Sequence, residues 1–244
     1  MSYTMPKWLQ ILARQFPGIR KSLASFTSIK SAKTCKLEDI TFHFDKRLMD
    51  RKRFVAIAAG AIETEEVEVA KSFLNKSDIL VEFGAGLGIA AARVNRAVRP
   101  KKHICFEANP RLIEYAKKIF SENKLDVNLE MSALGDGEQL PFYSLDDYIL
   151  SSFQKPTDRD DFNQIIVPTV SLEQVINQYQ PSAIFCDVEG AELDYLDAKD
   201  FGSIKTIILE LHPNIYGSEG VLQFHKRMAK HGFMKKLKNG DAYC

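Results

Sequence analysis

The stretch that most constrains this chain is the segment 81–89, which reads VEFGAGLGI. An apolar run leads into Glu82 and then into three alternate glycines, Gly84, Gly86 and Gly88. A buried strand followed by a glycine-rich turn brings the backbone of an α/β sheet close to a nucleotide, because glycine has no Cβ to hold a ligand away. The next ten residues, IAAARVNRAV, are rich in helix formers, so we expect the turn to open a helix.

Three interpretations of this turn stay open on its residues alone. The segment 86–91 fits a loose G-x-G-x-x-A dinucleotide pattern. The wider spacing E-x-G-x-G-x-G, from Glu82 to Gly88, is the one that class I methyltransferases use for S-adenosylmethionine. The third interpretation is a glycine-rich turn that binds no ligand.

A second acidic residue supports nucleotide binding. The run HICFEANP is a short apolar strand that ends in Glu107. Glu107 follows the glycines by about the twenty residues at which a ribose-binding carboxylate is expected. A carboxylate can accept hydrogen bonds from both ribose hydroxyls. NAD and S-adenosylmethionine both contain a ribose, so Glu107 does not choose between them.

Length and composition exclude several classes of protein. The 244 residues suffice for one large α/β domain, and a net charge of +1 gives no reason to expect a nucleic-acid partner. No apolar run is long enough to span a membrane, and the N-terminus lacks the features of a signal peptide. The cysteines lack metal or redox spacing, and those in strand-like runs indicate a reducing compartment, which we take to be the cytoplasm. The four cysteines are Cys35, Cys105, Cys186 and Cys244, and those in strand-like runs are Cys105 and Cys186.

From residue 78 onward the chain alternates strands and helices, which predicts an α/β fold with a mostly parallel, doubly wound sheet. The expected strands are 79–83, 103–107, 127–131, 183–187 and 206–210. We expect a helix over 64–73 that is capped by Thr64, and a later helix over about 220–231 that leads into a strand near 232–234. The predicted division is a helical arm with lead-in strands over 1–54 and the main domain over 55–244.

Two segments fall outside this alternation. Apolar residues at helical spacing in the arm predict a helix that packs on its own domain or on a partner subunit, which would allow a homodimer; the alternative is a membrane-surface or partner-binding helix. The polar segment 140–163 is too long for an ordinary connection, and we interpret it as a substrate-side lid with a hairpin near 140–143.

Polar side chains collect where the fourth and fifth expected strands end. CDVEGAE supplies Asp187, Glu189 and Glu192, and LELHP supplies Glu210 and His212. Ligands of open α/β sheets bind outside the carboxyl ends of the strands, so these groups are expected to share one rim with the glycine turn. A methyl-accepting hydroxyl needs a base; we expect Asp187 next to the methyl or the acceptor, and His212 as a base that titrates near neutrality. Some of these residues have types that suit a metal, but no spacing demands one and none is predicted.

Several pieces taken together resemble the FkbM family of S-adenosylmethionine-dependent methyltransferases. They cover about residues 54–213 in the family's order and read AGAIETEE, VEFGAGLG, FEANP, SALGD, TVSLEQV, CDVEGAE and LELHP. The chain departs from the common family pattern in having Glu82 for Asp, Ala85-Gly86-Leu87 for Ala-Asn-Ile, and Glu173 for Asp.

The resemblance implies a Rossmann-like class I methyltransferase with a reversed final strand and O-methylation of a hydroxyl on a sugar, glycan or small metabolite. An NAD-linked oxidoreductase and a catalytically inactive nucleotide-binding interaction module stay open as alternatives. The implied cofactor contacts are Glu82, Phe83, Gly84, Ala85, Gly86, Gly88, Glu107, Ala108, Asn109, Ser132, Ala133 and Asp187. The expected catalytic residues are Asp187, His212, Glu189 and Glu192.

Overall fold

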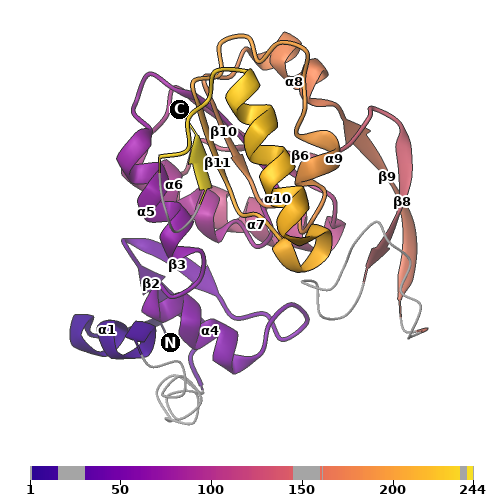
Figure 1. Cartoon of the computed structure of the whole chain (residues 1–244). Coiled ribbons are helices and arrows are strands. Elements are labelled where there is room, and N and C mark those ends of the chain that lie inside the picture. The colour runs from indigo at the N-terminus through magenta and orange to yellow at the C-terminus, as the bar shows by residue number, and fades with distance from the viewer. Residues whose placement is uncertain (1, 16–30, 145–159, 161, 237–240, 244) are drawn as a thin grey trace.

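The computed structural model describes residues 2–15, 31–144, 160, 162–236 and 241–243, and its centre is a six-stranded sheet (Figure 1). The strand order is β12 (Asp241–Tyr243), β11 (Thr206–Leu209), β10 (Ala183–Cys186), β4 (Ile79–Phe83), β5 (Lys102–Glu107) and β6 (Asn128–Met131). The five strands from β11 to β6 run parallel, and β12 pairs antiparallel with β11. The predicted parallel sheet with a reversed final strand is therefore confirmed.

Helices cover both faces of this sheet because its strands are apolar on both sides. Leu80 packs against α5 (Thr64–Phe73) and α6 (Ile89–Val98), and α7 (Pro110–Glu122) covers the β5–β6 end of the same face. Val81 and Phe83 point to the opposite face, against α8 (Leu172–Tyr179), α9 (Glu192–Tyr195) and α10 (Pro213–Lys230). The doubly wound arrangement follows directly from this alternation.

The N-terminal elements form a smaller layer beside α7. A three-stranded sheet contains β1 (Ser2–Thr4), β2 (Thr34–Leu37) and β3 (Ile40–His43), with α1 (Lys7–Gln15) and α4 (Arg51–Ala59) packed nearby. Side chains of this layer and of α7 share one buried cluster. The predicted division after residue 54 falls inside α4.

Several local predictions are corrected. Thr64 does not cap α5: Glu63 occupies the cap position in the left-handed region, and the Thr64 hydroxyl donates to the Gly60 carbonyl. α10 begins at Pro213 rather than near 220, and non-helical φ/ψ angles at Gly217 mark a kink within it. The segment 232–234 is a turn and an irregular stretch rather than a strand start.

The segment 140–163 contributes to a β-ribbon that projects from the main body (Figure 1). β8 (Gln139–Ser144) pairs antiparallel with β9 (Asn163–Val170), and β9 also pairs with the short β7 (Ala133–Leu134). The predicted hairpin is thus longer than expected, and the centre of the predicted lid lies outside the described residues.

Candidate active site

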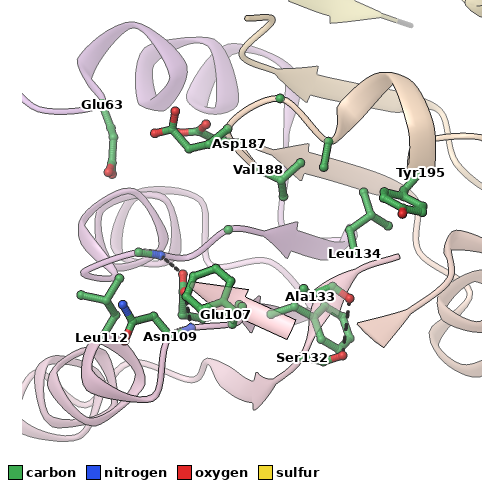
Figure 2. Close-up of a pocket in the computed structure, with 18 of the residues that line it drawn as sticks. Glu63, Glu107, Asn109, Leu112, Ser132, Ala133, Leu134, Asp187, Val188 and Tyr195 are labelled. Atoms are coloured by element: carbon green, nitrogen blue, oxygen red, sulfur yellow. Dashed lines mark hydrogen bonds between the residues drawn. The ribbon is translucent and has the colours of Figure 1, made fainter. Parts of the chain in front are cut away.

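The strand order reverses between β4 and β10, and a cavity of about 660 Å³ lies at this point. It opens at the carboxyl ends of the strands, where open α/β sheets bind their ligands. Glu63, Glu107 and Asp187 surround this space in Figure 2. The sequence-predicted residues that line it are Gly84, Gly86, Glu107, Ala108, Asn109, Ser132, Ala133, Asp187 and Glu189.

The three glycines of the turn are required for three different reasons. A Cβ on Gly84 would lie 1.7 Å from the backbone oxygen of Asp187, so this glycine lets β4 and β10 approach at the switch point. A Cβ on Gly88 would lie 2.9 Å from Ala116 and Phe120, so this glycine lets α6 pack on α7. A Cβ on Gly86 would meet nothing within 4 Å and would stand at the cavity wall. Only Gly86 leaves space that a ligand can fill.

Glu107 is fixed by two backbone groups at the cavity wall. One carboxylate oxygen accepts the N–H of Gly86 at 2.7 Å and the other accepts the N–H of Asn109 at 2.8 Å. Burial raises the pKa of this carboxyl. A carboxylate offers about four lone-pair sites, so capacity for ribose hydroxyls remains after these two bonds.

Four predicted cofactor residues lie behind the cavity wall instead of in it. Glu82 faces the α5–α6 side of the sheet, where its carboxylate pairs with His103 Nε2 at 3.0 Å and both side chains are buried. Phe83 points to the other face and stacks on Phe106, which does line the cavity. Ala85 and Gly88 are packed under the turn. For Glu82 and Phe83 strand alternation explains this outcome, because their side chains enter the two faces of the sheet.

His212 lies at the centre of three carboxylates. Its Nδ1 donates to Glu192 Oε1 at 3.1 Å, while its Nε2 lies 3.3 Å from Glu189 Oε2 and 3.8 Å from Asp187 Oδ1. Both ring nitrogens therefore face acceptors, which suits the doubly protonated imidazolium. The hydrogen bonds that His212 donates to Glu189 and Glu192 raise its pKa to about 10. We expected His212 to titrate near neutrality, and its pKa of about 10 contradicts that expectation.

Asp187 is the carboxyl group of this cluster whose pKa is raised to near neutrality. Burial, followed by the charges of Glu189 and Glu210, raises its pKa to about 7, against the lowering effect of His212. Its Oδ1 is buried and has no hydrogen-bond partner among the described residues. This oxygen lies on the His212 side, and the residue itself lines the cavity.

Glu192 is a buried residue that holds the loop after β10. Its side chain is 0% exposed, and Oε1 accepts the N–H groups of Val188 and Gly190 as well as the His212 ring. Glu192 is not among the residues that line the cavity, and its contacts hold the loop after β10; its predicted catalytic role stays a prediction.

Asp187, Glu210 and His212 each place a ligand atom within 4.8 Å of the others. The donor types suit a divalent ion. However, both His212 nitrogens face carboxylates, which raise the pKa of the ring to about 10 and favour the protonated form that has no lone pair for a metal. The arrangement therefore favours a charged histidine over a metal ligand.

Sequence reasoning missed several residues that line the cavity. Phe106, Phe142, Tyr195 and Ile215 supply apolar walls, and their positions depend on strand register and on the entry into α10. Glu63 was visible only as part of AGAIETEE, a piece to which no role was attached.

The parallel doubly wound sheet, the glycine turn and the buried carboxylate beside it define a Rossmann-like nucleotide-binding fold. Residues 82–237, more than half of the chain, match the methyltransferase FkbM domain. The chain belongs to this family, and its cofactor is S-adenosylmethionine. The cavity fits that cofactor, because Gly86 leaves open space beside its backbone and Glu107 keeps acceptor capacity. The NAD-linked and inactive-module alternatives are therefore set aside.

The chain is also similar to several solved structures at low identity. For precorrin-6y C5,15-methyltransferase from Geobacter metallireducens GS-15 the identity is 13%, with 83% of this chain and 87% of that chain covered and a TM-score of 0.43. For M. jannaschii TYW2 in complex with AdoMet the identity is 15%, with 86% of this chain and 81% of that chain covered and a TM-score of 0.46. A comparison with curated proteins finds no significant match.

Proposed function

We propose that this enzyme methylates a hydroxyl group of a sugar, glycan or small metabolite. The observation that carries the proposal is the Asp187 carboxylate, with one oxygen buried and unpartnered beside the His212 imidazolium. An alcohol needs to lose its proton as it is methylated, and Asp187 can accept that proton. The pKa of about 7 makes Asp187 a stronger base than an ordinary carboxylate.

The proposed division of labour follows from these contacts. When bound, S-adenosylmethionine supplies a methyl group on a positively charged sulfur. Asp187 orients the acceptor hydroxyl and takes its proton, and His212 holds the loop acids in place by contacts with Glu189 and Glu192. Holding the two reactants together in the cavity would contribute up to roughly 7–11 kcal/mol to the lowering of the barrier.

The proposed orientation of the cofactor follows from the cavity walls. Glu107 accepts the ribose hydroxyls, and Ser132 and Ala133 lie beside the adenine. The reactive end then lies toward Asp187, at the end of β10. Acids dominate the charged groups of the lining, with Arg53 the one basic residue among the described lining residues, which supports a neutral acceptor over a phosphate-rich one.

A screen with methyl-labelled S-adenosylmethionine tests the acceptor class. We expect label transfer to at least one hydroxylated sugar, glycan or metabolite, and none to the same molecules with the hydroxyl replaced by hydrogen. Matched amines and transfer RNA serve as competing acceptors. Transfer to an amine or to RNA, with none to any alcohol, would contradict the proposal.

The ribose assignment is tested at Glu107. Glu107→Gln is expected to weaken S-adenosylmethionine by about 1.5–3 kcal/mol, the usual range for a hydrogen bond to a charged group. Calorimetry measures the dissociation constant, with Glu114→Gln, an exposed acid on α7, as the matched control. An unchanged dissociation constant in folded Glu107→Gln protein would remove Glu107 from the ribose site.

Two further sequence-based expectations belong to the proposal. The described cysteines Cys35, Cys105 and Cys186 are free and buried, which supports a reducing compartment such as the cytoplasm. None of the described helices is long and apolar enough to cross a membrane. A homodimer through the N-terminal arm stays a prediction, which the mass of the protein in solution would test.

A further inference from the structure

We infer that Glu63 binds the α-ammonium group at the methionine end of S-adenosylmethionine. This assignment rests on the cofactor orientation proposed above, and it concerns a residue to which the sequence analysis gave no role. Glu63 precedes α5 and lines the cavity.

The position of Glu63 matches the methionine end of the proposed orientation. Figure 2 shows Glu63 and Asp187 on one side of the cavity, and Ser132 and Ala133 on the other, with Glu107 nearer the middle. A cofactor with its ribose at Glu107 and its adenine beside Ser132 and Ala133 extends its remaining arm toward Glu63.

The carboxylate of Glu63 is held in place before any ligand binds. Its Oε2 accepts the N–H of Ala90, in the first turn of α6, at 2.7 Å. Glu63 also has φ 50 and ψ 38, in the left-handed region that residues other than glycine rarely occupy. These two features fix the direction of the side chain, and strained backbone of this kind is common at ligand sites.

The surroundings of Glu63 favour a positively charged ligand. Burial raises the pKa of Glu63 to about 8, and the nearby charges of Asp187, Glu82 and Glu66 act in the same direction. Glu63 and Asp187 line the same cavity, and the charge of Asp187 is one cause of the raised pKa of Glu63. A bound cation would stabilise both carboxylates.

The hydrogen-bonding chemistry selects the ammonium over the sulfonium. An ammonium has N–H groups to donate to a carboxylate, whereas a sulfonium has none. One Glu63 oxygen accepts the N–H of Ala90, and the other has no hydrogen-bond partner among the described residues, so it can accept from an ammonium. The sulfonium is left for the Asp187 side, where the methyl group is transferred in the proposed function.

A binding experiment with two ligands tests this assignment. S-adenosylhomocysteine carries the α-ammonium but no sulfonium, and its deamino analogue keeps the carboxylate and lacks the ammonium. Glu63→Gln should weaken S-adenosylhomocysteine roughly 10- to 100-fold, the range for a hydrogen bond between charged groups, and should leave the deamino analogue unchanged. Calorimetry on the full chain measures both dissociation constants.

Matched variants separate this result from general damage. Glu65→Gln changes an exposed acid in the first turn of α5 and should alter neither dissociation constant. Glu63→Asp keeps the charge and should preserve part of the preference for the amino ligand. Equal losses for both ligands, or no loss for either, would overturn the assignment. A larger loss for S-adenosylmethionine than for S-adenosylhomocysteine would also overturn it, because Glu63 would then face the sulfonium.

This experiment is independent of the proposed reaction. No acceptor takes part, so a negative result at Glu63 would leave hydroxyl methylation standing. Glu107→Gln, which acts at the ribose, should weaken the two ligands by the same factor. A variant that weakens them by different factors is therefore specific to the methionine end.

Discussion

Replacing Gly86 with valine is expected to abolish S-adenosylmethionine binding in a protein that still folds. A Cβ at this position meets nothing within 4 Å and stands at the cavity wall, so a valine side chain would extend from there into ligand space. Gly86 has φ 55, so the valine also strains the backbone, by about 1–3 kcal/mol. Calorimetry should detect no binding, and the cofactor should no longer raise the melting temperature.

The control for backbone strain is Gly232→Val. Gly232 has φ 87, a Cβ there would also meet nothing within 4 Å, and it does not line the cavity. We expect this variant to lose stability but to bind the cofactor normally. Gly84→Ala is unsuitable as a binding test, because its Cβ would strike the Asp187 backbone and the fold itself would suffer. Normal affinity in folded Gly86→Val protein would show that the turn is not the binding site.

The parallel sheet could be predicted because its strands are recognisable in the sequence. β4 and α6 have the expected bounds, 79–83 and 89–98. Short apolar runs that alternate with amphipathic segments are the signature of a doubly wound sheet. The carboxyl ends of parallel strands share one edge, so the meeting of Asp187 and His212 could also be predicted.

Other features could not be predicted because they depend on contacts between distant segments. α4 is buried at every position from Phe54 to Ala59, so its sequence shows no polar face to reveal a helix. Glu63 enters the site through a left-handed backbone conformation that no residue pattern indicates. The charge of His212 results from carboxylates on another strand end and its loop, so an ordinary histidine pKa was the wrong starting point.

Asp187→Asn is expected to lower turnover at saturating cofactor by roughly 10²–10⁴-fold, because the change removes the base and keeps the shape. The matched control is Asp200→Asn, an exposed residue in the turn before β11. Turnover is measured with the acceptor that the label screen finds. Full activity in Asp187→Asn, or activity that depends on added Mg²⁺ or Mn²⁺, would contradict the role of Asp187 as base.

The pH dependence of the wild-type enzyme and of His212→Gln separates the two residues. If Asp187 is the base, turnover rises with pH as Asp187 loses its proton, with a midpoint above the roughly 4 of an ordinary aspartate. The pKa of about 7 applies before the cofactor binds, and the sulfonium charge moves the midpoint below that value. His212 lowers the pKa of Asp187, so His212→Gln should move the rising limb to higher pH. If His212 were the base, His212→Gln would abolish the rise of turnover with pH. That result would contradict the role of Asp187 and identify His212 as the base.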